Sequence, residues 1–169
     1  MIQPNKILVI RFSSLGDLIL TSPIFRELRR IFPGANLNLL TSVGFGDVLD
    51  NNPHLDRIIK HPRKENFEQL NQLIEELQAE EFDLIYDAHR SMRSRWIVSR
   101  LTAFGMKRKP AVWKIDKRTL NRKLLIHLGW NRLQQGLSQR EQWLLPLKQH
   151  APNGLDAVSY THLTLPTKA

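Results

Sequence analysis

Apolar and polar positions follow two different periods along this chain. Short continuous apolar runs, such as residues 7–10, are typical of strands that are buried on both faces of a sheet. Longer segments repeat their apolar residues every three or four positions, which predicts amphipathic helices. The clearest of these repeats comprises Phe67, Leu70, Leu73, Ile74 and Leu77. The two patterns alternate, and such alternation predicts an α/β fold with a parallel sheet and flanking helices.

Apolar patterns give the ranges of the expected strands and helices, and proline and glycine mark where some of them end. The pattern predicts strands over 6–12, 36–41, 56–60, 83–88 and 110–113, and helices over about 16–31, 65–80, 92–104, 119–128 and 139–147. Pro23 should kink the first helical stretch, or divide it into a turn and a helix that starts at Ser22, and Pro33 with Gly34 should end it. We expect the last helix to stop near Pro146.

The turn after the first strand carries candidate chemistry. Ser13, Ser14 and Gly16 are small enough for a tight turn, and Asp17 follows them at the carboxyl edge of the expected sheet. In α/β proteins this edge holds the ligand. An aspartate at this point is also a common helix cap, and the residue alone favours that simpler interpretation.

Polar residues also follow the strand at 83–88. His89, Arg90, Arg93 and Ser94 should lie at the same edge, close to Asp17 if the two strands are neighbours. Arginine suits sugar phosphates and carboxylates, because its planar group donates two parallel hydrogen bonds. The alternative is that His89 caps the next helix and the arginines face water. Arg63 and Lys64, in the loop after the third strand, are further candidates for phosphate contact.

Composition narrows the class of protein. The chain has 169 residues, 41% of them hydrophobic, which is enough for one domain with its own core. It has no cysteine, so disulfides and thiol catalysis are excluded, and a reducing compartment fits. No stretch approaches the ~20 apolar residues of a membrane span, and the first residues do not resemble a signal peptide. We therefore expect a cytoplasmic protein.

Positive charge is concentrated in one part of the chain. The net charge is +9, and residues 90–123 contain twelve Lys or Arg and a single acid, Asp116. Such a segment is a solvated surface, or it meets nucleic acid, an anionic membrane or an acidic substrate. Zinc-ligand spacing, an aromatic RNA-binding motif and a clear helix-turn-helix are all absent from the sequence, so we expect no nucleic-acid partner.

The sequence does not match other catalytic motifs, because the residues concerned lack the required spacing. Gly44 and Gly46 begin a dinucleotide-binding pattern, but Leu49 stands at the third glycine position, and the pair follows the second strand instead of the first. The histidines lack the close spacing of metal ligands. Ser13 and Ser14 are not in a Gly-x-Ser-x-Gly turn, so hydrolase chemistry has no support.

Three blocks of sequence resemble the N-terminal half of glycosyltransferase family 9, the lipopolysaccharide heptosyltransferase family. They comprise residues 10–17 with 20–23 and 28–33, then 35–40 with 48–53 and 55–59, then 82–87 with 93–94 and 99–101. The resemblance implies a Rossmann-like sheet that forms one half of a GT-B glycosyltransferase. Residues 1–157 would be the acceptor-binding domain, with the donor-binding domain missing, and residues 158–169 a non-native or disordered tail.

The resemblance also implies a reaction. This is the inverting transfer of heptose from ADP-heptose to the lipid A–Kdo core of lipopolysaccharide, without a cofactor or metal, at the cytoplasmic face of the inner membrane. Asp17 would be the general base, and Ser13, Ser14 and Gly16 would shape its turn. Because donor contacts come mostly from the second domain, the fragment alone would be inactive. The alternative function is a non-catalytic basic module that binds nucleic acid or an anionic membrane.

Overall fold

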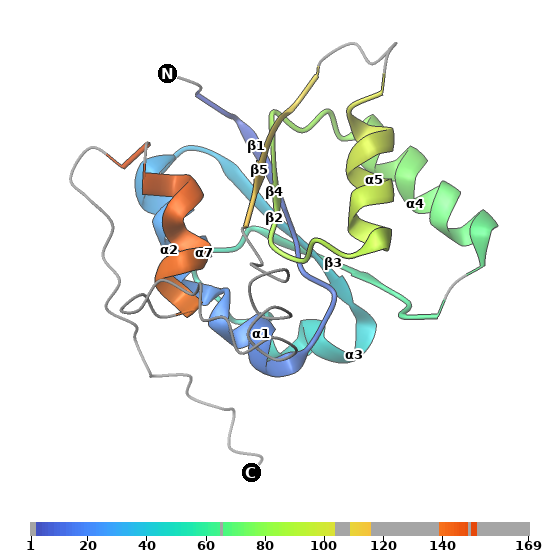
Figure 1. Ribbon diagram of the computed structural model, residues 1–169, viewed down its shortest axis with the longest axis horizontal. Coiled ribbons are helices and arrows are strands. Elements are labelled where there is room, and N and C mark those ends of the chain that lie inside the picture. The colour runs from blue at the N-terminus through green and yellow to red at the C-terminus, as the bar shows by residue number, and fades with distance from the viewer. Residues whose placement is uncertain (1–2, 65, 104–108, 116–138, 149, 152–169) are drawn as a thin grey trace, which may run out of the picture.

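The computed structural model describes residues 3–64, 66–103, 109–115, 139–148 and 150–151. Within them, one sheet of five parallel strands has the order β3-β2-β1-β4-β5 (Figure 1). The strands are β1 (Lys6–Ile10), β2 (Asn36–Ser42), β3 (Arg57–His61), β4 (Leu84–Asp87) and β5 (Ala111–Lys114). The predicted Rossmann-like α/β fold is therefore confirmed. The five predicted strands are all present, although β1 ends two residues earlier than expected.

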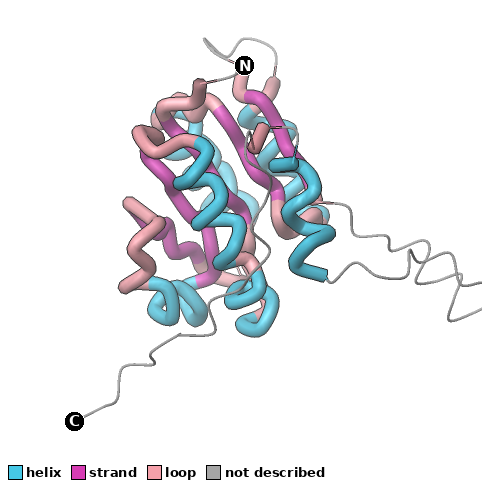
Figure 2. Tube along the Cα trace, turned by 90° about the vertical axis from the view of Figure 1, so that its left-hand side faces the viewer, coloured by secondary structure: helices cyan, strands magenta, loops and turns pink. Residues whose placement is uncertain are grey.

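Helices cover both faces of this sheet. They are α1 (Leu15–Leu20), α2 (Ser22–Ile31), α3 (Val43–Gly46), α4 (Phe67–Ala79), α5 (Met92–Leu101) and α7 (Gln139–Lys148). In Figure 1, α2 and α7 lie on one side of the strands and α4 and α5 on the other, and the side view of Figure 2 shows helices running alongside the strands. α1 and α3 lie at the end of the sheet where β1 and β2 finish.

The central strand β1 explains the two layers. Its side chains alternate between the faces, so Ile7 and Val9 belong to the core with α2 and α7. Leu8 and Ile10 belong to the core with α4 and α5. All four side chains are fully buried, which is why this segment of the sequence is continuously apolar.

The predicted division of the first helix is confirmed. α1 ends at Leu20, and α2 begins at Ser22 with Pro23 in its first turn. Proline is favoured there because its missing N–H group has no partner in a first turn. The side chain of Thr21, between the two helices, donates to the carbonyl of Leu18 at 2.5 Å. The chain can therefore change direction without leaving a buried hydroxyl unpaired.

One helical segment was missed. The single turn of α3 and the 3-10 turn Asp47–Leu49 were not predicted, because Gly44 and Gly46 are poor helix formers and the segment is too short for a periodic pattern. The last helix, predicted over 139–147 with its end near Pro146, ends at Lys148, one residue later, and contains the proline. Leu144 and Leu147 are buried in the core on either side of the proline, and this packing favours the helix through it. The helix predicted at 119–128 and the tail at 158–169 lie outside the described residues.

Helix α7 is fastened to the sheet by a buried hydrogen bond. The phenol of Tyr86, on β4, donates to the backbone carbonyl of Trp143. Tyr86 is wholly buried, and this burial raises the pKa of its hydroxyl above the ordinary value of 10.0. The pair joins residues far apart in sequence, so α7 is part of the same core as the first strand.

Two aspartates accept hydrogen bonds from backbone N–H groups at the amino edge of the sheet. Asp83 Oδ2 accepts the backbone N–H groups of Asn5 at 2.7 Å and Lys6 at 3.0 Å. Asp56 Oδ2 accepts the N–H of Leu37 at 2.6 Å and a guanidinium hydrogen of Arg29 at 2.5 Å. The acids at this edge therefore hold strand ends together.

Candidate functional site

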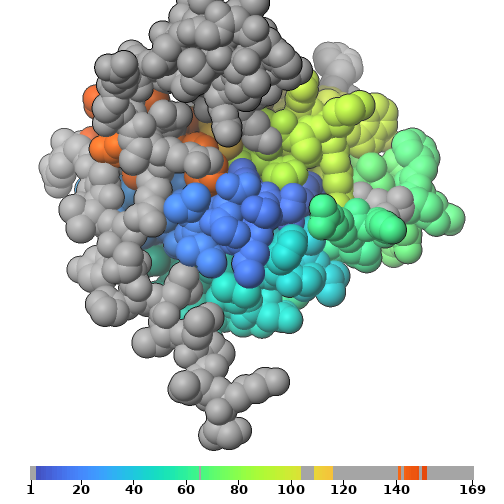
Figure 3. All heavy atoms as spheres, turned by 60° about the horizontal axis from the view of Figure 1, so that its bottom comes forward, coloured from blue at the N-terminus to red at the C-terminus, as the bar shows by residue number. Residues whose placement is uncertain are grey.

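At the carboxyl edge of the sheet, the connections that follow two neighbouring strands lead to opposite faces of the sheet. The connection after β1 leads into α2, which packs on one face, whereas the connection after β4 leads into α5 on the other face. Because β1 and β4 are neighbours, their two connections diverge at the strand ends, which is the position at which open α/β sheets have their ligand crevice. Figure 3 brings this edge forward, with the blue residues that include α1 between cyan α3 and yellow-green α5. In open α/β sheets, ligands bind at this position.

Asp17 lies at this crevice, in the first turn of α1. Its side chain is 35% exposed, and its Oδ2 atom forms an ion pair with Arg11 and accepts the N–H of Ser14 at 3.4 Å. No described residue donates a hydrogen bond to the other oxygen, Oδ1. The residue therefore does act as a helix cap, as the simpler interpretation held. One oxygen is nevertheless left for a ligand.

Arg11 is a member of the site that the sequence analysis did not assign. Its side chain is only 4% exposed, and one terminal nitrogen binds Asp17 while the other donates to the carbonyl of Ala88 at 2.5 Å. The guanidinium also lies 4.9 Å from the ring centre of Trp143. Burial lowers the pKa of Arg11, and the negative charge of Asp17 opposes this effect. One buried cation thus joins the loop after β1 to the loop after β4.

A signal for Arg11 is present in the sequence. It continues the alternation of Ile7 and Val9 within the predicted strand 6–12, so a charged residue is expected at a buried position, and Arg11 is buried directly after β1. Buried charges are paired as a rule, so a carboxylate partner nearby was to be expected. The first acid along the chain from there is Asp17.

Asp87 organises the loop after β4. Its Oδ1 atom accepts the N–H groups of His89 at 3.0 Å and Arg90 at 2.8 Å, and its Oδ2 atom accepts the hydroxyl of Ser94 at 3.2 Å. Arg90 has a φ of 49°, a left-handed conformation that these bonds support. Ser91, not His89, caps α5, because its hydroxyl accepts the N–H of Ser94 at 3.1 Å. The alternative interpretation, in which His89 caps the helix, is therefore wrong, because the cap lies two residues later.

Ser94 is wholly buried and acts within the fold. Its hydroxyl accepts the N–H of Ser91 at 2.9 Å in addition to its bond with Asp87. A direct contact between Ser94 and a substrate stays a prediction. The described contacts give this side chain the role of fixing where α5 begins.

The two predicted arginines of this loop hold neighbouring segments. Arg90 donates to the carbonyl of Ile115 at 2.9 Å, and Arg93 donates to the carbonyl of Pro62 at 3.0 Å. The Arg93 guanidinium also lies 4.0 Å from the ring centre of Phe12, and that ring meets His89 edge to face at 5.6 Å. Phe12, His89 and Arg93 thus form one packed group beside the crevice. Substrate contacts by these residues stay predictions.

The remaining predicted residues are open to solvent. Arg63 and Lys64 are exposed in the loop between β3 and α4, and no other described residue binds their side chains. Ser13 and Ser14 form the turn before α1, and Ser14 is exposed. A Cβ atom added to Gly16 would meet nothing within 4 Å, so the fold itself does not require glycine at this position. The space above Gly16 is open to a ligand.

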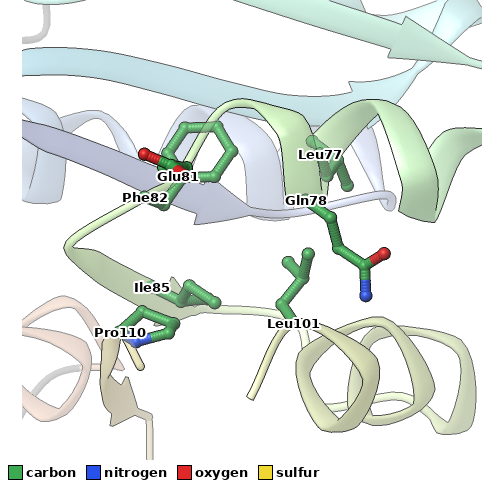
Figure 4. Close-up of a pocket in the computed structure, with 7 residues that line it drawn as sticks. All are labelled: Leu77, Gln78, Glu81, Phe82, Ile85, Leu101 and Pro110. Atoms are coloured by element: carbon green, nitrogen blue, oxygen red, sulfur yellow. The ribbon is translucent and has the colours of Figure 1, made fainter. Parts of the chain in front are cut away.

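Other parts of the described chain offer no competing site. A small hollow lies between the ends of α4 and α5, lined by residues that include Phe82 and Pro110 (Figure 4). Both residues precede a strand, so the hollow is at the amino edge, opposite Asp17. The described residues contain no group of three or more His, Asp or Glu able to hold a metal ion. Among them, no helix has the length and apolar character needed to cross a membrane.

Comparison with curated proteins gives three matches of one kind. The chain is 28% identical over 111 residues to lipopolysaccharide heptosyltransferase 1 of Escherichia coli K12, which covers 60% of this chain and 34% of that protein. It is 27% identical over 101 residues to the protein of the same name in Pseudomonas aeruginosa, covering 54% and 28%. The chain therefore spans about a third of the length of these relatives. No family model matches it.

Solved structures share the fold. A glycosyl transferase family 9 protein from Veillonella parvula has a TM-score of 0.67 at 19% identity, covering 91% of this chain and 43% of the other. E. coli heptosyltransferase WaaC with ADP-2-deoxy-2-fluoro heptose has a TM-score of 0.60 at 24% identity, covering 90% and 51%. The resemblance to family 9 heptosyltransferases is therefore confirmed, and the sheet matches one half of this GT-B fold.

Proposed function

We propose that this chain is the acceptor-binding half of an inverting glycosyltransferase. The enzyme transfers heptose from ADP-heptose to a hydroxyl of the lipid A–Kdo core of lipopolysaccharide. The similarity to heptosyltransferase 1 proteins supports the class of reaction. The donor is proposed because WaaC, which shares the fold, has been solved with ADP and with an ADP-heptose analogue.

The main support for the proposal is that Asp17 Oδ1 accepts no hydrogen bond from any described residue. Inverting transfer needs one base that takes the proton of the acceptor hydroxyl as that oxygen attacks the sugar. Asp17 Oδ1 has no donor among the described residues and lies where α/β sheets bind ligands. Arg11 holds Oδ2 from the buried side, so the carboxylate keeps one orientation while Oδ1 takes the proton.

The second requirement is a surface for the acceptor. The lipid A–Kdo core carries phosphates and carboxylates, which attract cations. Arg63 and Lys64 are exposed in the loop that Arg93 fastens through the carbonyl of Pro62. We assign to Arg63 and Lys64 the binding of acceptor charge. Such an acceptor places the enzyme in the cytoplasm, at the inner membrane.

The third requirement, stabilisation of the departing ADP, belongs to the other half of the protein. The chain covers 51% of a WaaC structure, so the proposed enzyme needs a second domain for donor binding. Residues 1–157 alone are expected to bind acceptor without transferring sugar. No metal or cofactor is needed in this proposal, because the nucleotide sugar is itself the activated substrate.

The test joins residues 1–157 to the donor-binding half of E. coli heptosyltransferase 1. We expect this protein to transfer heptose from ADP-heptose to the lipid A–Kdo acceptor. Replacing Arg63 and Lys64 together by Gln should raise the acceptor KM at least tenfold and leave the donor KM unchanged. The matched control is Lys109→Gln, an exposed cation at the opposite edge of the sheet. A folded protein that binds ADP but transfers no heptose would contradict the proposal.

A further inference from the structure

Helices α4 and α5 carry charges of opposite sign. α4 contains three glutamates and no Lys or Arg, whereas α5 contains three arginines and no acid. Five of these side chains are exposed: Glu68, Glu75, Glu76, Arg95 and Arg100. Within the part of the chain that the structure describes, none of the five forms an ion pair or a side-chain hydrogen bond. Negative charge on one helix therefore lies beside positive charge on the next, and neither is used inside the fold.

Exposed apolar side chains lie at the start of the same two helices. Phe67 begins α4 and is 67% exposed, Met92 begins α5 and is 87% exposed, and Trp96 is 43% exposed one turn further along α5. The rings of Phe67 and Trp96 lie 6.4 Å apart, so the apolar group spans both helices. We call these three residues and the five exposed charges the α4–α5 face. Its apolar part is larger than the single exposed residues that are normal on a protein surface.

The two helices run side by side in the same direction, on the right of Figure 1. Phe67 and Trp96 join the early part of both helices, and the side chain of Gln78 donates to the carbonyl of Arg100 at 3.1 Å near their ends. Each helix follows a strand of the same parallel sheet, which explains the shared direction. Positions along α4 can therefore be compared directly with positions along α5.

Acid and base lie at matching positions on the two helices. Glu75 and Arg100 are each eight residues after the first residue of their helix, which is about 12 Å along it. Glu68 and Arg95 both lie within the first four residues of their helices. An acid on α4 thus has a base at the same level on α5, once near the start and once near the end.

We infer that the α4–α5 face binds the same face of a second copy of this chain. A two-fold axis parallel to the helices lays α4 of each copy over α5 of the other and keeps the helix direction. Glu75 then meets Arg100 of the second copy, Glu68 meets Arg95 of the second copy, and the apolar side chains of both copies meet at one end. Each contact occurs twice, as in any isologous interface. The inference does not depend on sugar transfer.

The distribution of charge favours a second copy over other partners. The chain carries a net charge of +9, so two copies repel each other over most surfaces, whereas the α4–α5 face is close to neutral. Nucleic acid would meet the glutamates of α4, and a basic peptide would meet the arginines of α5. Arg63 and Lys64 lie before α4 at the rim, where water and salt screen their repulsion.

The test is sedimentation equilibrium of the full chain over a range of concentrations. We expect a monomer–dimer equilibrium in the wild type. Trp96→Ser should raise the dimer Kd about fivefold or more, because it removes an aromatic side chain from the interface. The control for this variant is Leu145→Ser on α7, across the sheet, since Leu145 is also exposed and apolar. It should dimerise as the wild type does.

Reversal of single charges tests the geometry of the pairing. Glu75→Arg and Arg100→Glu should each raise the dimer Kd about tenfold or more, because like charges then face each other twice. A mixture of these two variants should form a heterodimer with nearly the wild-type Kd, since each acid again meets a base in both contacts. Lys148→Glu, a charge reversal on α7, is the matched control and should leave the Kd unchanged. All variants should keep the wild-type Tm, because the altered charges are exposed and unpaired.

Three results would overturn the inference. The first is a wild type that stays monomeric at its highest soluble concentration. The second is a dimer whose Kd is unaffected by Trp96→Ser, Glu75→Arg and Arg100→Glu, or whose two charge variants do not recover when mixed. The third is a monomer that binds single-stranded oligothymidylate and loses this binding on Arg100→Glu, which would assign the face to nucleic acid.

Discussion

Replacing Asp17 by Asn should destabilise the fold as well as remove the proposed base. Asn has almost the same size and can still accept a hydrogen bond, but it carries no charge. The guanidinium of Arg11, which is 4% exposed, would keep its bond to Ala88 and lose its counter-ion. The change therefore isolates the value of one ion pair between a buried cation and a partly exposed acid.

The magnitude follows from the burial of the two partners. A hydrogen bond to a charged group contributes about 1.5–3 kcal/mol, and breaking a wholly buried ion pair costs about 3–5 kcal/mol. The Asp17 side chain is 35% exposed, so water screens part of the effect. We expect Asp17→Asn to lower the free energy of unfolding by about 2 kcal/mol, at the low end of these ranges. In a chain of this size, that loss lowers Tm by about 4–8 °C.

The assay is urea unfolding of four proteins: wild type, Asp17→Asn, Arg11→Met and the double variant. Because Arg11→Met removes the cation, Asp17→Asn should cost little in its presence, and the coupling energy should exceed about 1 kcal/mol. The matched control is Asp47→Asn, since Asp47 is 77% exposed and pairs with Lys60; it should change stability by less than about 0.5 kcal/mol. If Asp17→Asn matches this control, or the two changes are additive, the buried pairing is refuted.

Three further variants test other contacts. Ser94→Ala should lower the free energy of unfolding by about 1–3 kcal/mol in urea, because it leaves Asp87 Oδ2 and the N–H of Ser91 without their described partner; an unchanged midpoint would contradict this. Tyr86→Phe should cost about 1 kcal/mol at pH 8, since the carbonyl of Trp143 loses its donor. Burial raises the pKa of Tyr86 above 10.0, so wild-type stability should fall as pH rises past 10 and the gap to Tyr86→Phe should close; a gap that is constant from pH 8 to 11 would refute the burial argument. Asp56 has its pKa lowered below 3.8 because its bonds to Leu37 and Arg29 outweigh the opposing effect of burial. Its contribution is present above pH 3.8 and lost as pH falls through the lowered pKa, so the difference between wild type and Asp56→Asn should shrink in acid unfolding below pH 4.

The sheet could be predicted because each strand is buried. Ile7 to Ile10 are apolar at every position, since both faces of β1 are covered, and Pro23 marks where α2 begins. The turn of α3 could not be predicted, because its glycines disfavour a helix and β2 and β3 hold it in place by tertiary contact. The helix over 139–147 was predicted to within one residue, although it contains Pro146, because packing against the core outweighs the lost hydrogen bond.

The candidate site was predictable in part. Asp17 and the loop after β4 were expected at one edge, and the pairing of β1 with β4 brings their connections together. The bond from Arg11 to the carbonyl of Ala88 could not be read from the sequence, because Ala88 is 77 residues away. Nor could the sequence show that Arg90 and Arg93 donate to the carbonyls of Ile115 and Pro62. Only the fold reveals which polar groups are used internally and which are left for a ligand.

The central claim is that Asp17 takes the proton of the acceptor hydroxyl. The measurement that tests it most directly is the kcat for heptose transfer by residues 1–157 joined to a donor-binding half, compared between wild type, Asp17→Asn and Asp47→Asn. We expect Asp17→Asn to lower kcat by about 10²-fold or more, the usual contribution of a general base, with the acceptor KM almost unchanged. Asp47→Asn should retain wild-type turnover. An Asp17→Asn protein that transfers heptose within threefold of the wild-type rate would contradict the account.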